Sequence, residues 1–398
     1  MVQTPSANDT FFGLDISGAK KKLLSVRRKI SKRFLLIEFG LDSLTFCEAK
    51  VVKDQLFCSK INRLEIDKGA VERGTPTDTK AMGSFLREVI EEEQICGHRV
   101  GITLPPQAAL SKIIYLPKHL NYFQAIDYVS NPSSSGFQFP IPLENTDFDL
   151  IPLEIEGINN KENMKAYFLN SIPKKLVDNV IKTLSEAKLE LHSLDISYSS
   201  LERLADTSIN NLEGNQVLLL IELALESTHF YILSSNGPIH VSNLAAIKAF
   251  ETKNNYQGEV SIEEDTVNSE DYLAISKLDL KVLFNEVRNE IEISKRKYNL
   301  DISEILLSGI NSAHPKINNL FQDNFEIKTS ILRAMSSKDI GGISLTKQLV
   351  MQDLNRIIGL GLSMVQEEDI NQDNLSPNIK NNDKGISFSE YNNKELNE

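Results

Sequence analysis

The chain has 398 residues, of which 41% are hydrophobic and 25% charged, and its formal net charge is -12. This length suits two large domains, and the acidic balance disfavours general binding to nucleic acid because phosphates would be repelled. No apolar run approaches the roughly 18 residues of a membrane span, and the N-terminus lacks the apolar core of a secretory signal. Three cysteines without a Cys-x-x-Cys pair favour a reducing compartment, and six scattered histidines give no zinc motif.

The chain begins with a basic leader, residues 1–32, of which residues 1–14 are predicted to be disordered. Residues 15–33 hold eight Lys and Arg against one acid. The segment Lys20–Arg33 is either a solvated basic helix or a contact with an anionic membrane surface, where each basic residue contributes about 1 kcal/mol. Its apolar residues are too sparse to anchor a helix in a membrane by themselves.

The first domain, residues 33–213, starts as a run of strands and continues into a helix whose apolar residues recur at helical spacing. Residues 106–188 then change in character, with several prolines, and predict a small α+β insertion. The predicted strands are 33–39, 44–52, 56–66, 100–104, 111–116, 147–156, 164–170 and 191–196, and the predicted helices are 78–95, 173–187 and 198–207.

The second domain, residues 214–345, restarts with strands and a turn at Asn236-Gly237, and includes a subdomain at about 244–302. A closing helix at 346–366 is expected to return to the first lobe. The tail from 367 to 398 holds eight Asn and eight acids and is predicted to be disordered. The predicted strands are 216–223, 228–234, 239–243, 302–307 and 325–329, and a long helix is predicted at 277–298.

One hairpin occurs twice in the chain. Leu35–Phe46 recurs as Leu219–Phe230 at a constant offset of 184 positions, with 7 of 12 residues identical. Each copy passes from an apolar strand through a short polar turn into a second strand. Two copies, one at the start of each domain, predict a duplicated protein whose two lobes hold a ligand between their turns.

The order and spacing of these features resemble the actin-like ATPase superfamily and, within it, the PilM family of type IV pilus assembly proteins, over roughly residues 33–366. The resemblance implies an α/β actin-like two-lobed fold, built from duplicated ribonuclease H-like domains, with the α+β subdomain inserted at about 106–188. Gly13–Ser17 is similar to the opening motif that is usual in the family, but it is followed by a basic run rather than by a pair of strands. The segments that carry the resemblance are Glu38–Ser43, Ile114–Pro117, Phe139–Glu144, Leu194–Ile196, Glu222, Leu307–Gly309 and Gly359–Leu362.

The resemblance also implies a site for ATP and Mg²⁺ between the two hairpin turns. In the family each first strand ends in an aspartate that places Mg²⁺ and water, while backbone N–H groups and a hydroxyl of each turn cradle the phosphates. No metal site formed by protein side chains alone is predicted. The implied site residues are Glu38 and Glu222 for catalysis, and Gly40, Ser43, Ser227 and Gly309 for the cofactor.

Several substitutions predict that this nucleotide site is degenerate. Each glutamate has one methylene more than aspartate, and Ala224 stands where the family prefers glycine. Asp42 and Glu226 would bring negative charge to the phosphates, and one such pair at about 4 Å costs roughly 4 kcal/mol at an effective dielectric near 20. Gly309 stands alone where a glycine pair is usual. A pseudo-ATPase or weak ATP binder is therefore expected rather than an active ATPase.

The function that the resemblance implies is that of a cytoplasmic scaffold, peripherally associated with the inner membrane. It would bind the N-terminal cytoplasmic segment of PilN in a groove on the first lobe and its insertion, and serve twitching motility, DNA uptake or adhesion. Two alternatives stay open: an active actin-like ATPase or sugar-kinase-like enzyme, and a cell-division filament resembling FtsA. The polar tail differs from the amphipathic C-terminal helix by which FtsA usually anchors.

Overall fold

The computed structural model describes most of the chain, including both predicted lobes. Predictions for the basic leader before Lys32, for Phe139–Glu144 and for the tail after Asp373 lie outside the described residues, apart from a small β1–β2 hairpin (Thr10–Phe11 and Leu14–Asp15). The described residues are 10–11, 14–15, 32–131, 145–154, 158, 162–225, 227–247, 266–267, 275–345 and 349–373.

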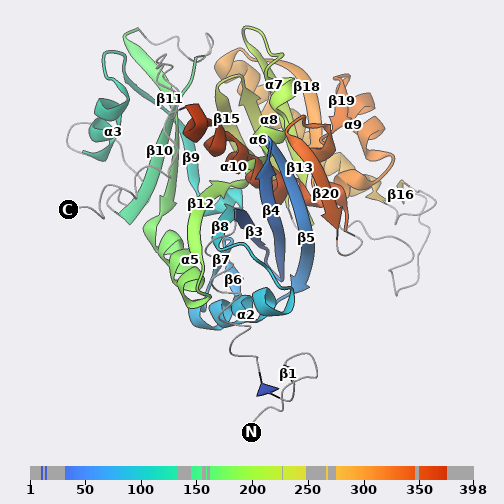
Figure 1. Ribbon diagram of the computed structural model, residues 1–398. Coiled ribbons are helices and arrows are strands. Elements are labelled where there is room, and N and C mark those ends of the chain that lie inside the picture. The colour runs from blue at the N-terminus through green and yellow to red at the C-terminus, as the bar shows by residue number, and fades with distance from the viewer. Residues whose placement is uncertain are drawn as a thin grey trace.

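Two sheets of matching topology form the centre of the molecule (Figure 1). Each sheet begins with three antiparallel strands that follow one another in the chain. Two further strands lie beside the first of these three and run parallel to it. The duplicated hairpin predicts this repetition. The first sheet has the order β12 (Glu190–Ile196), β8 (Arg99–Leu104), β3 (Arg33–Phe39), β4 (Ser43–Val52), β5 (Gln55–Glu65), β20 (Ile340–Leu345), and the second β15 (Gly237–Leu244), β14 (Thr228–Ser234), β13 (Gln216–Leu223), β18 (Asp301–Ser308), β19 (Thr329–Ile331).

Both first strands are buried almost along their whole length. Phe34–Ile37 of β3 and Val217–Leu223 of β13 are buried without a polar alternation. Continuous apolar runs of this kind are typical of strands that are covered on both faces. Each strand ends in the hairpin turn that carries the predicted site residues, so the buried sheets fix where those residues lie.

Strand β20 corrects the predicted limit of the second lobe. It pairs in parallel with β5 and forms the sixth strand of the first sheet. Residues 340–345 therefore belong with the first lobe, although the sequence analysis placed them in the second. A parallel pairing across about 280 residues leaves no local signal in the sequence, which is why the periodicity did not reveal it.

Among the residues that the structure describes, the inserted subdomain has a three-stranded sheet, a helix packed on it and a small core of its own. Its strands have the order β10 (Thr146–Pro152), β11 (Met164–Pro173), β9 (Leu110–Pro117), and its helix is α3 (Tyr122–Ser130). Helix α5 (Lys174–Glu186), predicted within the insertion, packs instead on α2 (Thr79–Glu92) of the first lobe, where Gly83 meets Glu186. The separate core consists of Ile114, Leu116, Ala125, Val129, Leu150, Tyr167 and Leu169.

Helix α10 (Asn355–Asp373) closes the chain against the first sheet and α6 (Ser197–Leu204). A Cβ at Gly359 would lie 2.0 Å from the Ser200 carbonyl oxygen, so only glycine allows the two helices this close. The helix continues to Asp373, seven residues into the tail that was predicted to be disordered.

The second sheet is covered by α8 (Lys277–Tyr298) and α9 (Ile317–Phe325), whose Phe284 and Phe321 rings meet edge to face. Helix α9 occupies residues before the predicted strand 325–329, and the strand observed there, β19, begins only at Thr329. The remaining short elements are β6 (Val71–Glu72), β7 (Thr75–Pro76), η2 (Pro106–Ala108), α7 (Asp206–Ile209), β16 (Thr266–Val267), β17 (Ile275–Ser276), η4 (Ile310–Ala313), η5 (Ala334–Ser336) and η6 (Met351–Leu354).

Candidate functional site

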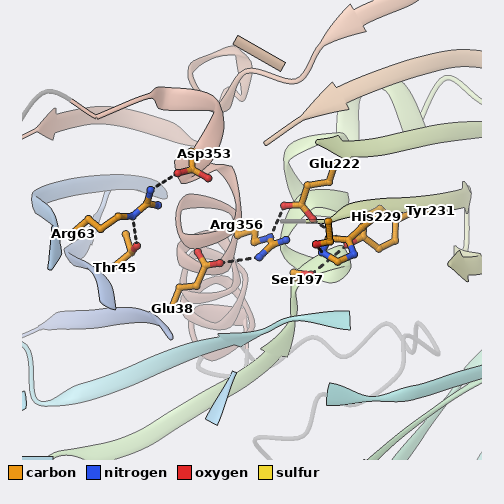
Figure 2. Close-up of polar contacts among 10 residues, drawn as sticks. Glu38, Thr45, Arg63, Ser197, Glu222, His229, Tyr231, Asp353 and Arg356 are labelled. Atoms are coloured by element: carbon orange, nitrogen blue, oxygen red, sulfur yellow. Dashed lines mark hydrogen bonds and ion pairs between the residues drawn. The ribbon is translucent and has the colours of Figure 1, made fainter. Parts of the chain in front are cut away.

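The two hairpin glutamates meet at one arginine (Figure 2). Glu38 on β3 and Glu222 on β13 both bind Arg356, which lies in the first turn of α10. Arg356 Nη1 donates to Glu38 Oε1 at 2.9 Å, and Arg356 Nε donates to Glu222 Oε1. Only 14% of the arginine side chain is exposed. One buried guanidinium therefore joins a carboxylate of the first lobe to the equivalent carboxylate of the second.

The pKa values of the two carboxyl groups that bind Arg356 shift in opposite directions. Burial raises the pKa of Glu38 and outweighs the opposing charge of Arg356. Burial also acts to raise the pKa of Glu222, but the charge and hydrogen bond of Arg356 outweigh it, and the Tyr231 hydroxyl helps by donating to Glu222 Oε2 at 3.1 Å. Burial alone would lower the pKa of Arg356, yet the two carboxylates hold it well above its usual range. The arginine is therefore charged, and its stronger partner is Glu222.

The segment just before Arg356 adds further links to both lobes. Asp353 of η6 accepts a hydrogen bond from Arg63 on β5 of the first lobe. Gln352 offers its carbonyl oxygen to the backbone N–H of Gly309 in the second lobe, at 3.3 Å. Asn355 Nδ2 donates to the Ser308 hydroxyl and to the Leu332 carbonyl oxygen, each at 3.0 Å. Residues 352–356 thus tie the two lobes together at the position where the sequence predicted a nucleotide.

In the second hairpin the predicted phosphate-binding hydroxyl is already engaged. Burial lowers the pKa of His229, so its ring is neutral. Its Nδ1–H donates to Asn243 Oδ1 at 2.7 Å, which leaves Nε2 to accept from the Ser227 hydroxyl at 2.9 Å. The Ser227 proton therefore points to the histidine within its own hairpin.

The first hairpin keeps a tight turn. The Gly40 N–H donates to the Ser43 carbonyl oxygen at 2.7 Å, and a Cβ at Gly40 would lie 2.7 Å from Ser43 Oγ. Asp42 is exposed at the tip, beside Leu41, which is 56% exposed. Its counterpart Glu226 lies outside the described residues. Gly40 and Ser43 therefore shape the turn itself.

Gly309 serves as a packing site between the second hairpin and η4. Its φ is +82°, and a Cβ there would lie 2.5 Å from the Leu223 carbonyl oxygen. Asn311, two residues later, donates its side-chain amide to the Ala224 carbonyl oxygen at 2.7 Å. Glycine at 309 is thus required by the close approach to the β13 backbone.

Glu38 and Glu222 meet at Arg356, and Gly309 lies against the second hairpin. The roles in catalysis and cofactor binding that the resemblance implies for these residues stay predictions. Arg356 was not foreseen, although a single basic residue at the start of the apolar run Ile357–Leu362 is a usable signal. A charge in a helix that is otherwise buried needs a buried partner of opposite sign.

The described residues contain no cluster of His, Cys, Asp or Glu suited to holding a metal ion by itself. No helix among the residues searched is long and apolar enough to cross a membrane. Of the basic segment Lys20–Arg33, only Lys32 and Arg33 are described, and Arg33 Nη1 pairs with the buried Glu48 at 2.5 Å. Arg33 therefore has a structural role inside the first lobe.

Comparison with known proteins identifies the relationship. The family model for type IV pilus assembly protein PilM matches residues 37–244, which is more than half of the chain. No curated protein matches. Among solved structures, the chain is similar to a PilM-PilN type IV pilus biogenesis complex, with a TM-score of 0.63 and 15% identity, over 83% of this chain and 98% of that one.

Two further structures are similar at lower scores. One is a protein of actin-like ATPase fold and unknown function from Bacteroides thetaiotaomicron, with 12% identity, a TM-score of 0.40 and coverage of 76% of this chain and 91% of that one. The other is MreB5 of Spiroplasma citri bound to ADP, with 10% identity, a TM-score of 0.40 and coverage of 87% and 99%. The family-model match and the similarity to the PilM-PilN complex confirm the predicted actin-like two-lobed fold, and the chain belongs to the PilM family of type IV pilus assembly proteins.

Proposed function

We propose that this chain is a scaffold of the type IV pilus assembly platform that binds the N-terminal cytoplasmic segment of PilN, and that its lobes are held together without a nucleotide. The observation that carries the proposal is the position of Arg356 between Glu38 and Glu222. It gives the site a tethered cation where the actin-like family would place Mg²⁺ beside ATP.

Mg²⁺ and ATP fit poorly at this site. A metal ion would need the same two carboxylates that Arg356 already binds, and breaking a buried ion pair costs about 3–5 kcal/mol. Micromolar-to-millimolar ATP binding amounts to only about 4–8 kcal/mol, so displacing Arg356 would consume most of it. The backbone N–H of Gly309 is also occupied, by Gln352 of the segment leading into α10. A pseudo-ATPase therefore suits these contacts better than an active enzyme.

Binding to PilN is supported by membership of the family and by the similarity to a PilM-PilN complex. The insertion has a small core of its own beside the main core, and we place the PilN segment against the first lobe and this insertion. We place the protein in the cytoplasm at the inner membrane, where such a segment would be accessible. The basic leader would favour an anionic surface through its residues before Arg33, since Arg33 is bound to Glu48.

Calorimetric titration of the full chain with a synthetic N-terminal segment of PilN from the same organism tests the proposal. We expect binding whose affinity is the same with and without about 1 mM Mg-ATP, a concentration that would saturate any functional nucleotide site. Absence of binding would remove the PilN assignment. Binding that requires Mg-ATP would instead support the active ATPase, and pelleting of filaments would support the FtsA-like alternative.

A further inference from the structure

Helix α8 presents a basic and partly apolar face to solvent. The helix has 22 residues, about 33 Å at 1.5 Å per residue, and its opposite face is buried through Leu283, Val287 and Ile291. Among its outward side chains, Leu278 is 68% exposed and Ile293 56% exposed. Val282, which is 42% exposed, lies one turn after Leu278, so these two side chains form the apolar part of this face.

The charges of α8 are divided between its two sides. Two of its acidic residues, Glu286 and Glu290, face inward: Glu286 accepts from the Ala245 N–H, just after β15, at 2.6 Å, and Glu290 lies 2.8 Å from Nε2 of His240 on β15. Glu292 is exposed but pairs with Arg296 at 3.0 Å. Asp279 is half-buried in the first turn, and the exposed charges that remain on α8 are basic, on a chain whose net charge is -12.

The basic side chains form a line with a regular period. Lys281, Arg288 and Lys295 are exposed and follow one another at intervals of seven residues. Residues seven apart lie on nearly the same line of an α-helix. Arg288 is also held by the Asn324 side-chain oxygen at 2.8 Å and lies over the Phe325 ring. Lys281 and Lys295 form no ion pair with any other residue that the structure describes.

The apolar residues run beside this line at the spacing of a helix-helix contact. Val282 follows Leu278 by four positions, and the same row continues through Asn285, Asn289 and the ion-paired Glu292. In paired helices, such a row of alternating three- and four-residue steps forms the seam, and the flanking row at intervals of seven selects the partner by charge. Polar asparagine in a seam weakens the pairing but fixes its register.

We propose that the outer face of α8 docks an acidic amphipathic helix of a protein partner, with apolar residues over Leu278 and Val282 and carboxylates along Lys281, Arg288 and Lys295. A second copy of this chain is disfavoured because both copies carry a large net negative charge. An anionic membrane is disfavoured because Asn285 and Asn289 interrupt the apolar row that would enter the lipid.

The test uses the full chain and a synthetic peptide of three heptads. Each heptad of the peptide has leucine at its two seam positions and glutamate at the two positions that flank the seam. We expect a complex that weakens as salt rises, because the contact depends on charge. The double variant Lys281→Glu/Lys295→Glu should weaken binding at least tenfold. The matched control Lys175→Glu/Lys182→Glu makes the same change of charge on the exposed face of α5 and should bind like the unaltered chain.

Three outcomes would overturn the proposal: no binding at roughly 100 µM peptide, equal losses in both double variants, or equal binding of a scrambled peptide with the same composition. Binding of the chain to phosphatidylglycerol vesicles that Lys281→Glu/Lys295→Glu abolishes, without peptide binding, would assign the face to a membrane instead. The PilN titration serves as the control for folding, since the α8 variants should leave it unchanged. If the unaltered chain does not bind the PilN segment, that result counts against the proposed function and not against the proposal for α8.

Discussion

The two hairpins have nearly the same sequence but end in different electrostatic environments. Glu38 receives one hydrogen bond from Arg356 and its pKa is raised by burial, whereas Glu222 receives Arg356 Nε and the Tyr231 hydroxyl and its pKa is lowered. The Glu222 side chain is 3% exposed and that of Glu38 is 15%. Arg356 is therefore bound more strongly by Glu222 of the second lobe than by Glu38 of the first lobe.

The reason for the difference lies in the second strand of each hairpin. At the offset of 184 positions, His229 and Tyr231 of β14 correspond to Thr45 and Cys47 of β4. The Tyr231 hydroxyl donates a hydrogen bond to Glu222, whereas Cys47 is a buried thiol and gives Glu38 no comparable hydrogen-bond donor. Duplication thus preserved the strands, and two substitutions on the second strand distinguish the lobes.

Replacing Arg356 should have the largest effect. Arg356→Met leaves two buried carboxylates without a counter-charge, and we expect a loss of about 3–5 kcal/mol in the free energy of unfolding. Urea denaturation followed by circular dichroism measures it. Arg356→Lys should lose less, because a single ammonium keeps the charge but not the two separate N–H donors. Equal stability of Arg356→Met and the unaltered chain would show that the bridge does not hold the lobes.

Removing each carboxylate in turn should reproduce the asymmetry. Glu222→Gln loses the stronger charge-assisted bonds and should cost about 2–3 kcal/mol at pH 7, whereas Glu38→Gln should cost about 1 kcal/mol or less. Both variants keep the size of the side chain, so each is the control for the other. The asymmetry between the two carboxylates would be contradicted if Glu38→Gln lost more free energy of unfolding than Glu222→Gln in the same urea experiment.

Tyr231→Phe isolates the donor that the first hairpin lacks. Loss of the hydroxyl should cost about 1–2 kcal/mol, because Glu222 loses one hydrogen bond to a charged acceptor. The same change in a Glu222→Gln background should cost less, since the acceptor is then neutral, and this double-mutant cycle gives the coupling. Additive losses would mean that Tyr231 acts through packing alone.

The smallest expected effect is on the pH dependence of stability. The lowered pKa of Glu222 gives stability that is present above the ordinary carboxyl range and is lost as pH falls through the folded-state pKa. The raised pKa of Glu38 acts in the opposite sense, because the folded protein binds that proton more tightly and loses stability as pH rises through the window above 4.5. Urea midpoints between about pH 3 and 7 should therefore fall less on acidification in Glu222→Gln, and more in Glu38→Gln, than in the unaltered chain.

Local pattern predicted much of the fold, but it did not show that the two glutamates meet. The repeat at 35–46 and 219–230 identified equivalent strands, and the predicted bounds of the helix at 277–298 agree with α8. Arg356 and β20 escaped because their partners, Glu38 and β5, lie hundreds of residues away, and no periodicity encodes that distance. The obstacle to ATP that was expected from the turn acids Asp42 and Glu226 stays a prediction, and the contact of Arg356 with Glu38 and Glu222 was not foreseen.

Calorimetric titration of Mg-ATP into the full chain tests the central claim most directly, because Arg356 and a bound metal ion would compete for the same two carboxylates. We predict no binding at concentrations up to about 1 mM. Arg356→Lys, which keeps a cation in place, should behave in the same way. An affinity tighter than about 100 µM in the unaltered chain would contradict the account and restore the nucleotide site.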